Sequence, residues 1–149
     1  MRAVVQRVTE ARVTVDGKVV GEIGSGLLVF VGVAKGDDSR KVAYLANKLV
    51  GLRIFRDVEG RFECSVEQVG GAVLLVSQFT LYGDCRHGRR PSFDQAATAE
   101  EAEEVYEALV EALRVRGVPV MTGRFQRDMV VTSVNDGPVT LLLDGERAF

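Results

Sequence analysis

The stretch Gly24-Ser25-Gly26-Leu27-Leu28-Val29-Phe30-Val31 decides the fold of this chain. Gly24, Ser25 and Gly26 predict a turn, and five apolar residues follow without a polar interruption. A strand with one face in water alternates apolar and polar residues, so a continuous run favours a strand that is buried on both faces. The run Ala72–Phe79 has the same character and predicts a second buried strand.

The rest of the chain predicts further strands and two helices. Val- and Thr-rich segments with turn signals such as Asp16-Gly17 predict strands at 2–9, 11–15, 18–23, 53–55, 61–64, 118–121, 129–134 and 139–143. Apolar residues at helical spacing behind N-cap residues predict helices from about 39 to 52 and from Thr98 to about Gly117. The polar stretch 81–96 is expected to be a loop, and long loops often carry function.

These elements predict a single α+β domain over residues 1–149. The chain is 46% hydrophobic and 27% charged, which is typical of a globular protein with one core. We expect a curved, mostly antiparallel, barrel-like sheet that packs against two main helices.

Charge argues against a generic binder of polyanions such as DNA. The chain has 19 Lys and Arg against 21 Asp and Glu, so its net charge is 19 − 21 = −2. Six glutamates between 100 and 111 account for the acidic excess, because the rest of the chain has 19 bases against 15 acids. A local basic surface is therefore allowed, and Arg86, Arg89 and Arg90 in the polar stretch are candidate phosphate contacts by their charge and position.

Other classes are disfavoured by what the sequence does not contain. The N-terminal residues do not resemble a signal peptide, and the apolar runs are too short to cross a bilayer, so we expect a cytoplasmic protein without a membrane partner. Cys64 and Cys85 are too far apart for a Cys-x-x-Cys site, and His87 is the only histidine. We therefore expect no metal, no nucleotide cofactor and no His-dependent triad.

Two polar segments are candidates for chemistry. Ser77-Gln78-Phe79-Thr80 ends a buried strand, where a two-residue period places Gln78 and Thr80 on one face and backbone N–H groups could hold an oxyanion. The alternative is that these residues only cap the strand end. Asn135-Asp136-Gly137-Pro138 reads as a tight turn between strands, with a trans Gly137–Pro138 bond by frequency alone.

Taken together, the motifs resemble those of the D-aminoacyl-tRNA deacylase family along nearly the whole chain. They are Gln6-Arg7-Val8, the strand at 24–32, Ser77-Gln78-Phe79-Thr80-Leu81-Tyr82-Gly83-Asp84, Gly88-Arg89-Arg90-Pro91-Ser92-Phe93, Thr122-Gly123-x-Phe125 and Asn135-Asp136-Gly137-Pro138-Val139-Thr140. One departure is Gln126-Arg127, where the family commonly has Gly-Ala after the phenylalanine.

The resemblance implies hydrolysis of the ester that joins a D-amino acid, or glycine mischarged on tRNA-Ala, to the 3′ end of tRNA. It implies a homodimer with active sites at the interface and no cofactor. The catalytic segment Ser77, Gln78, Phe79 and Thr80 of one subunit would face a cis Gly137–Pro138 of the other, which excludes L side chains.

The resemblance also assigns supporting roles. Phe125 and Met129 would receive the terminal adenine, and Arg7 would hold the carbonyls of Gly137 and Pro138. Thr80 matches the residue to which the role of nucleophile was once assigned in the family, but no base in the sequence can activate that hydroxyl, so water is the expected nucleophile. Two alternatives stay open: a dimeric RNA-binding module without catalysis, and a hydrolase for another small ester.

Overall fold

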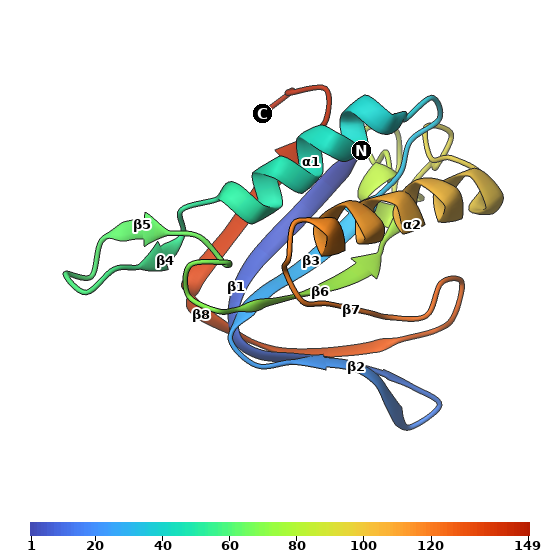
Figure 1. Ribbon diagram of the computed structural model, residues 1–149. Helices are drawn as coiled ribbons and strands as arrows, with labels where there is room; N and C mark the ends of the chain where they lie inside the picture. Colours follow the sequence, from blue (N-terminus) through green and yellow to red (C-terminus); the bar gives the residue numbers. More distant parts are fainter.

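A computed structural model describes residues 1–149, and the long strand β1 (Arg2–Val15) is the centre of its sheet (Figure 1). Antiparallel partners of β1 are β2 (Lys18–Ile23), β3 (Gly26–Gly32) and β8 (Val130–Asp144). Strand β6 (Ala72–Ser77) pairs in parallel with β3 and with β7 (Val120–Thr122). The six strands form one mixed sheet in the order β2-β1-β3-β6-β7, with β8 against β1.

The sheet curls until its ends approach each other. A Cβ added at Gly21 of β2 would lie 2.3 Å from the carbonyl oxygen of Thr122 in β7, so only glycine allows this approach. The result is a nearly closed, barrel-like sheet in a single α+β domain, which confirms the predicted fold class.

The buried strands have a core on each face. Leu28 and Leu74 belong to a cluster inside the curl of the sheet, whereas Leu27 and Leu75 belong to a larger cluster under the helices. Helices α1 (Ser39–Gly51) and α2 (Ala99–Val115) lie over that second face (Figure 1). Neighbouring residues on β3 and β6 therefore enter different cores, which confirms that the apolar runs are strands buried on both faces.

Both helices begin at the N-caps that the sequence offers. The side chain of Asp38 accepts hydrogen bonds from the backbone N–H groups of Arg40 and Lys41, and Thr98 forms a capping box with Glu101. A short hairpin of β4 (Phe55–Arg56) and β5 (Phe62–Cys64) projects from the body of the molecule (Figure 1). Neither helix is long and apolar enough to cross a membrane.

Three predicted boundaries were wrong. The predicted strands 2–9 and 11–15 form the single strand β1. Strand β6 ends at Ser77, and a 3₁₀ helix, η1 (Phe79–Tyr82), replaces the predicted continuation to residue 79. The predicted strands 129–134 and 139–143 are both part of β8, so residues 135–138 are not a turn between strands. Pairing with the neighbouring strand β1 on both sides of residues 136–139 overrides the local turn preference in β8.

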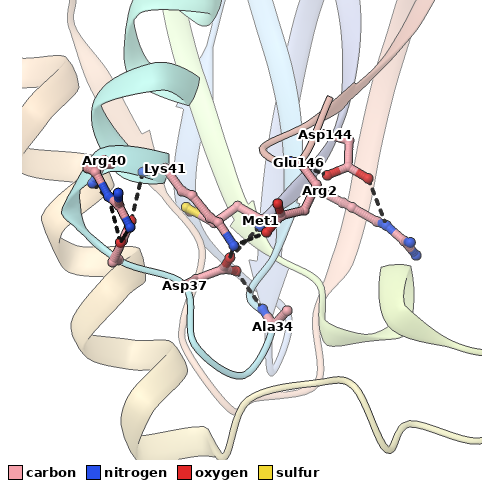
Figure 2. Close-up of polar contacts among 9 residues, drawn as sticks. Met1, Arg2, Ala34, Asp37, Arg40, Lys41, Asp144 and Glu146 are labelled. Atoms are coloured by element: carbon pink, nitrogen blue, oxygen red, sulfur yellow. Dashed lines mark hydrogen bonds and ion pairs between the residues drawn. The ribbon is translucent and has the colours of Figure 1, made fainter. Parts of the chain in front are cut away.

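A partly buried ion-pair network connects the start of the chain to α1 and to the C-terminal segment (Figure 2). The α-ammonium group of Met1 lies 2.7 Å from Oδ1 of Asp37, and both groups are buried. Lys41 pairs with Asp37 at 3.2 Å and also with Glu146. The hydrogen bond from Lys41 to Glu146 is the main cause of the raised pKa of the lysine. The network therefore joins the N-terminus, α1 and the C-terminal segment at one end of the sheet.

Candidate active site

A cavity of about 610 Å³ opens beside the end of β6. One wall is the segment Val76–Phe79, which contains three of the four predicted catalytic residues. The facing wall is the segment 125–129, which begins and ends with the predicted adenine-binding residues Phe125 and Met129. Ala97, Ala99 and Val131 complete the lining. The fold thus brings together two motifs that are far apart in the sequence.

The chain turns sharply where β6 ends, and its hydrogen bonds fix the first wall. The backbone N–H of Gln78 donates to the carbonyl of Val31 at 2.7 Å, so that N–H is occupied. A Cβ at Gly32 would lie 2.9 Å from the carbonyl oxygen of Gln78, so glycine in β3 permits the turn. The N–H groups of Phe79 and Thr80 begin η1, where a 3₁₀ helix provides no carbonyl partners.

The prediction that Gln78 and Thr80 lie on one face of a strand was wrong. Gln78 and Thr80 do not share a strand face, because η1 begins at Phe79. Their side chains are nevertheless close, since Nε2 of Gln78 donates a hydrogen bond to Oγ1 of Thr80. Thr80 is exposed and is not part of the cavity lining. Phe79 is 55% exposed and packs edge to face on Phe93, with ring centroids 5.0 Å apart.

The second wall rests on the carbonyl of Leu75. That oxygen accepts hydrogen bonds from Oη of Tyr106 at 2.8 Å and from the N–H of Gly123 at 3.3 Å. Burial raises the pKa of Tyr106, so the hydroxyl stays protonated and can donate. The ring of Phe125 packs against Tyr106 with centroids 5.9 Å apart, and Sδ of Met129 accepts a hydrogen bond from the N–H of Arg124.

Three exposed residues between Phe125 and Met129 also line the cavity. Gln126 has a positive φ of 58°, Arg127 pairs with Asp16 at 2.7 Å, and Asp128 provides a carboxylate. The sequence identified Gln126 and Arg127 only as a departure from the family pattern, and it did not single out Asp128. The sequence could have indicated that all three line the cavity, because they lie between the two predicted adenine-binding residues.

The Gly137–Pro138 segment forms a large bulge in β8. Gln6 pairs with Thr140 and Val8 pairs with Asn135, so the single residue Arg7 lies opposite residues 136–139. The side chain of Arg7 is 3% exposed, and its guanidinium lies against the bulge, where a Cβ at Gly137 would be 3.0 Å from Nη2. It donates to the carbonyls of Ile54 at 2.7 Å and Asp136 at 3.1 Å, and it lies 3.3 Å from the carboxylate of Asp136. Arg7 therefore holds the bulge through its first residue and not, as predicted, through the carbonyls of Gly137 and Pro138.

Local hydrogen bonds close the bulge. The side chain of Asn135 accepts from the N–H of Val139 at 3.2 Å and donates to Oγ1 of Thr140 at 3.0 Å. Gly137 has a φ of 129°, and the Gly137–Pro138 bond is cis. The trans bond expected from frequency alone is therefore wrong, and the isomer is the one that the resemblance implies.

Some predicted site residues are not brought to the cavity. Gly137 and Pro138 do not line it, nor do Arg86, Arg89 and Arg90. Nη2 of Arg86 is 2.5 Å from a carboxylate oxygen of Asp84, and the hydrogen bonds from Arg86 lower the pKa of that carboxyl group. His87 is exposed in the same loop, and no group of three or more His, Cys, Asp or Glu side chains is arranged to hold a metal ion.

The cavity is suited to a ligand that carries a flat ring and a reactive carbonyl. Phe125 and Met129 provide an apolar surface for a ring, and the start of η1 presents backbone N–H groups beside it. The lining includes no histidine, lysine or cysteine.

Comparison with known proteins places the chain in one family. A family model described as D-Tyr-tRNA(Tyr) deacylase matches residues 4–144. The D-aminoacyl-tRNA deacylase of Symbiobacterium thermophilum is 58% identical over 149 residues, which cover 100% of this chain and 99% of that protein. The protein of the same name from Thermotoga petrophila is 56% identical and covers 100% of both chains.

Solved structures agree on the fold. A structure described as "c-Myc DNA Unwinding Element Binding Protein" has a TM-score of 0.92 and 39% identity, and the match covers 97% of this chain and 98% of that one. A probable eukaryotic D-amino acid tRNA deacylase has a TM-score of 0.82 at 19% identity, over 95% and 97% of the two chains, and supports the fold alone. The chain belongs to the D-aminoacyl-tRNA deacylase family and is a hydrolase that acts on aminoacyl-tRNA.

Proposed function

We propose that this protein hydrolyses the ester bond between a D-amino acid and the 3′-terminal adenosine of tRNA, and releases the free amino acid and tRNA. The proposal rests on one observation: the Ser77–Phe79 segment and the residues Phe125 and Met129 line the same cavity. An adenine ring stacked on Phe125 and Met129 would place the adjoining ribose ester at the end of β6.

In the proposed reaction, water attacks the ester carbonyl. The backbone N–H groups of Phe79 and Thr80 are the candidate oxyanion donors, because the N–H of Gln78 is already bonded to Val31. The Thr80 hydroxyl accepts a hydrogen bond from Gln78 and has no base to remove its proton. The neighbouring ribose hydroxyl of the substrate could assist the attack.

Selectivity for D substrates would come from a second copy of the chain. Gly137 and Pro138 do not line the cavity of their own subunit, so they would act at the cavity of the partner in a homodimer. Their carbonyls lie in the bulge that Arg7 anchors through the carbonyl of Asp136, and they would accept the substrate ammonium group and leave no room for an L side chain. Glycine has no side chain, so glycine mischarged on tRNA-Ala would also be hydrolysed.

The direct test compares D-Tyr-tRNA, L-Tyr-tRNA and glycine mischarged on tRNA-Ala as substrates. We expect turnover of the D and glycyl substrates and none of the L substrate above the background rate. Equal rates on the D and L substrates would refute the stereochemical proposal. Binding without turnover of any substrate would favour an RNA-binding module instead.

A second experiment tests whether the site is shared. Mixed dimers of Gln78→Ala and Gly137→Val chains contain one site with both wild-type segments, whereas each variant alone contains none. We expect the mixture to regain activity after subunit exchange. Mixtures that exchange subunits but stay inactive would show that each site lies within one chain.

A nucleic-acid-binding function is the second candidate, because the 39% identical structure is described as a DNA-element-binding protein. The net charge of −2 gives little attraction for duplex DNA. Titration with duplex DNA and with tRNA at 50 and 200 mM salt separates the candidates. We expect measurable binding only to tRNA; comparable binding to DNA would favour the second candidate.

A further inference from the structure

Arg127 is the only cationic side chain among the residues that line the cavity. It belongs to a tight turn in which its N–H bonds to the carbonyl of Arg124 at 3.3 Å and Gln126 adopts a φ of 58°. The flanking residues Phe125 and Met129 are half-buried, while Arg127 is exposed. The turn therefore holds a guanidinium at the rim of the cavity, next to the apolar surface that would receive the adenine.

The side chain of Arg127 reaches across the cavity rim to the β1–β2 turn. Its Nη2 lies 2.7 Å from Oδ2 of Asp16, which is the first residue of that turn and has a φ of 49°. The two side chains are 57% and 80% exposed. An ion pair this exposed contributes little to stability, so a stronger partner can replace the aspartate.

The 3′-terminal adenosine of a tRNA is attached to the rest of the molecule through its 5′-phosphate. If the adenine lies on Phe125 and Met129, that phosphate is one ribose away and leaves the cavity at the rim. A phosphate offers two oxygens to the planar fork of an arginine, whereas the geometry with Asp16 uses one close contact. The phosphate is therefore the better partner for Arg127.

We propose that Arg127 binds the phosphate between the last two nucleotides of the tRNA, and that Asp16 holds the guanidinium at the rim until the tRNA displaces it. This inference rests on the proposed function, because it takes the adenine site as given. It assigns to one residue outside the common family pattern a role in gripping the RNA rather than in shaping the adenine pocket.

The test compares two substrates that differ in this phosphate. Arg127→Ala should lower kcat/KM on D-aminoacyl-tRNA about 10-fold, mainly through KM, and leave hydrolysis of D-aminoacyl-adenosine, which has no phosphate, unchanged. The matched control is Arg40→Ala, because Arg40 is also an exposed arginine paired with an aspartate, Asp38, but does not line the cavity. An equal loss on both substrates would mean that Arg127 only shapes the cavity, and no loss on either would refute the contact.

Binding of uncharged tRNA gives a readout that does not depend on hydrolysis. Arg127→Ala should reduce the slope of log affinity against log salt by about 0.7, the value for one single-strand phosphate contact. Asp16→Asn should raise the affinity about two- to threefold, and this gain should vanish in the double variant with Arg127→Ala. If the wild-type protein hydrolyses no substrate but the slope still falls, the proposed function fails while the phosphate contact stands. An unchanged slope would refute the contact alone.

Discussion

The cavity at the end of β6 and the bulge in β8 are held in opposite ways. The cavity is open, its walls end in exposed side chains, and Gln126, Arg127 and Asp128 at its rim have no buried partners. The bulge is filled by a buried arginine that binds two carbonyl groups, and the side chain of Asn135 closes it from the other side. One region leaves space for a ligand, and the other fixes a piece of backbone.

This difference suggests a division of labour between binding and selection. A cavity that stacks a base and positions an ester affects D and L substrates alike, because the base and the ester are the same in both. A rigid backbone wall can reject one stereoisomer only if it does not move, and the contacts of Arg7 provide that rigidity. Substitutions in the bulge should therefore alter the D-to-L ratio, which is kcat/KM on a D-aminoacyl-tRNA divided by kcat/KM on its L counterpart. Substitutions in the cavity should alter kcat/KM on both substrates equally.

The largest expected effect comes from Arg7→Ala. Removing the guanidinium leaves the carbonyls of Ile54 and Asp136 without their donor, and we expect the free energy of unfolding to fall by about 3 kcal/mol. Because the backbone of the bulge can then move, the ratio of kcat/KM on D-Tyr-tRNA to that on L-Tyr-tRNA should fall on the order of 100-fold. Parallel kinetics on both substrates measure the ratio, and urea unfolding measures stability.

Two further variants make the Arg7 experiment specific. Gly137→Ala keeps the arginine but places a Cβ 3.0 Å from its Nη2 at a φ of 129°, so the ratio should fall here as well. Asp136→Asn removes only a half-exposed carboxylate and keeps the carbonyl that Arg7 binds, so the ratio should hardly change. An unchanged ratio in a folded Arg7→Ala protein would show that the bulge does not determine the preference for D substrates.

The second effect tests the cavity. Phe125→Ala removes the proposed stacking surface and should lower kcat/KM about 30-fold on any accepted substrate. The D-to-L ratio should stay constant, since the bulge is untouched. Phe125→Leu retains packing against Tyr106 without a ring and should lose nearly as much activity while unfolding like the wild type. A change in the ratio would contradict the assignment of selection to the bulge.

The fold was largely predictable because its signals are local. The apolar runs at 27–31 and 72–79 predicted the strands that separate the two cores, and Asp38 and Thr98 predicted where the helices begin. The segment 135–138 was mispredicted as a turn, because local sequence preferences do not contain the pairing with β1, a strand far away in sequence, on both sides of this segment. The end of β6 was mispredicted for a similar reason, since the turn after Ser77 brings the carbonyl oxygen of Gln78 against Gly32 of β3, a contact that exists only in the folded sheet.

The site was predictable only in part. The motifs pointed to Ser77, Gln78, Phe125 and Met129, and the cavity brings these four together. The sequence could not reveal that the N–H of Gln78 is already bonded, or that Arg127 reaches Asp16, because both depend on contacts between distant segments. Whether Gly137 and Pro138 act at a second subunit stays a prediction.

A smaller effect on activity is expected from Gly123→Ala, which adds an atom next to the cavity and removes no side chain. A Cβ added at Gly123 would lie 2.6 Å from Sδ of Met129, so Gly123→Ala must displace the thioether that lines the proposed adenine site. Methionine is flexible, and we expect KM to rise about fivefold with kcat nearly unchanged. Gly24→Ala is the matched control, since a Cβ there meets no atom within 4 Å. A change in kcat instead of KM would show that Met129 affects the reacting bond as well.

The smallest effect is expected at Thr80, which lies next to the cavity wall but outside the lining. Thr80→Ala removes the hydroxyl that accepts from Gln78 but keeps the backbone N–H that is proposed to hold the oxyanion. If water is the nucleophile, kcat should change by less than about threefold. A single-turnover assay with a quench would detect an acyl-enzyme on Thr80 if one formed. Complete loss of activity in a folded Thr80→Ala protein would revive covalent catalysis and move Thr80 into the catalytic machinery of the cavity.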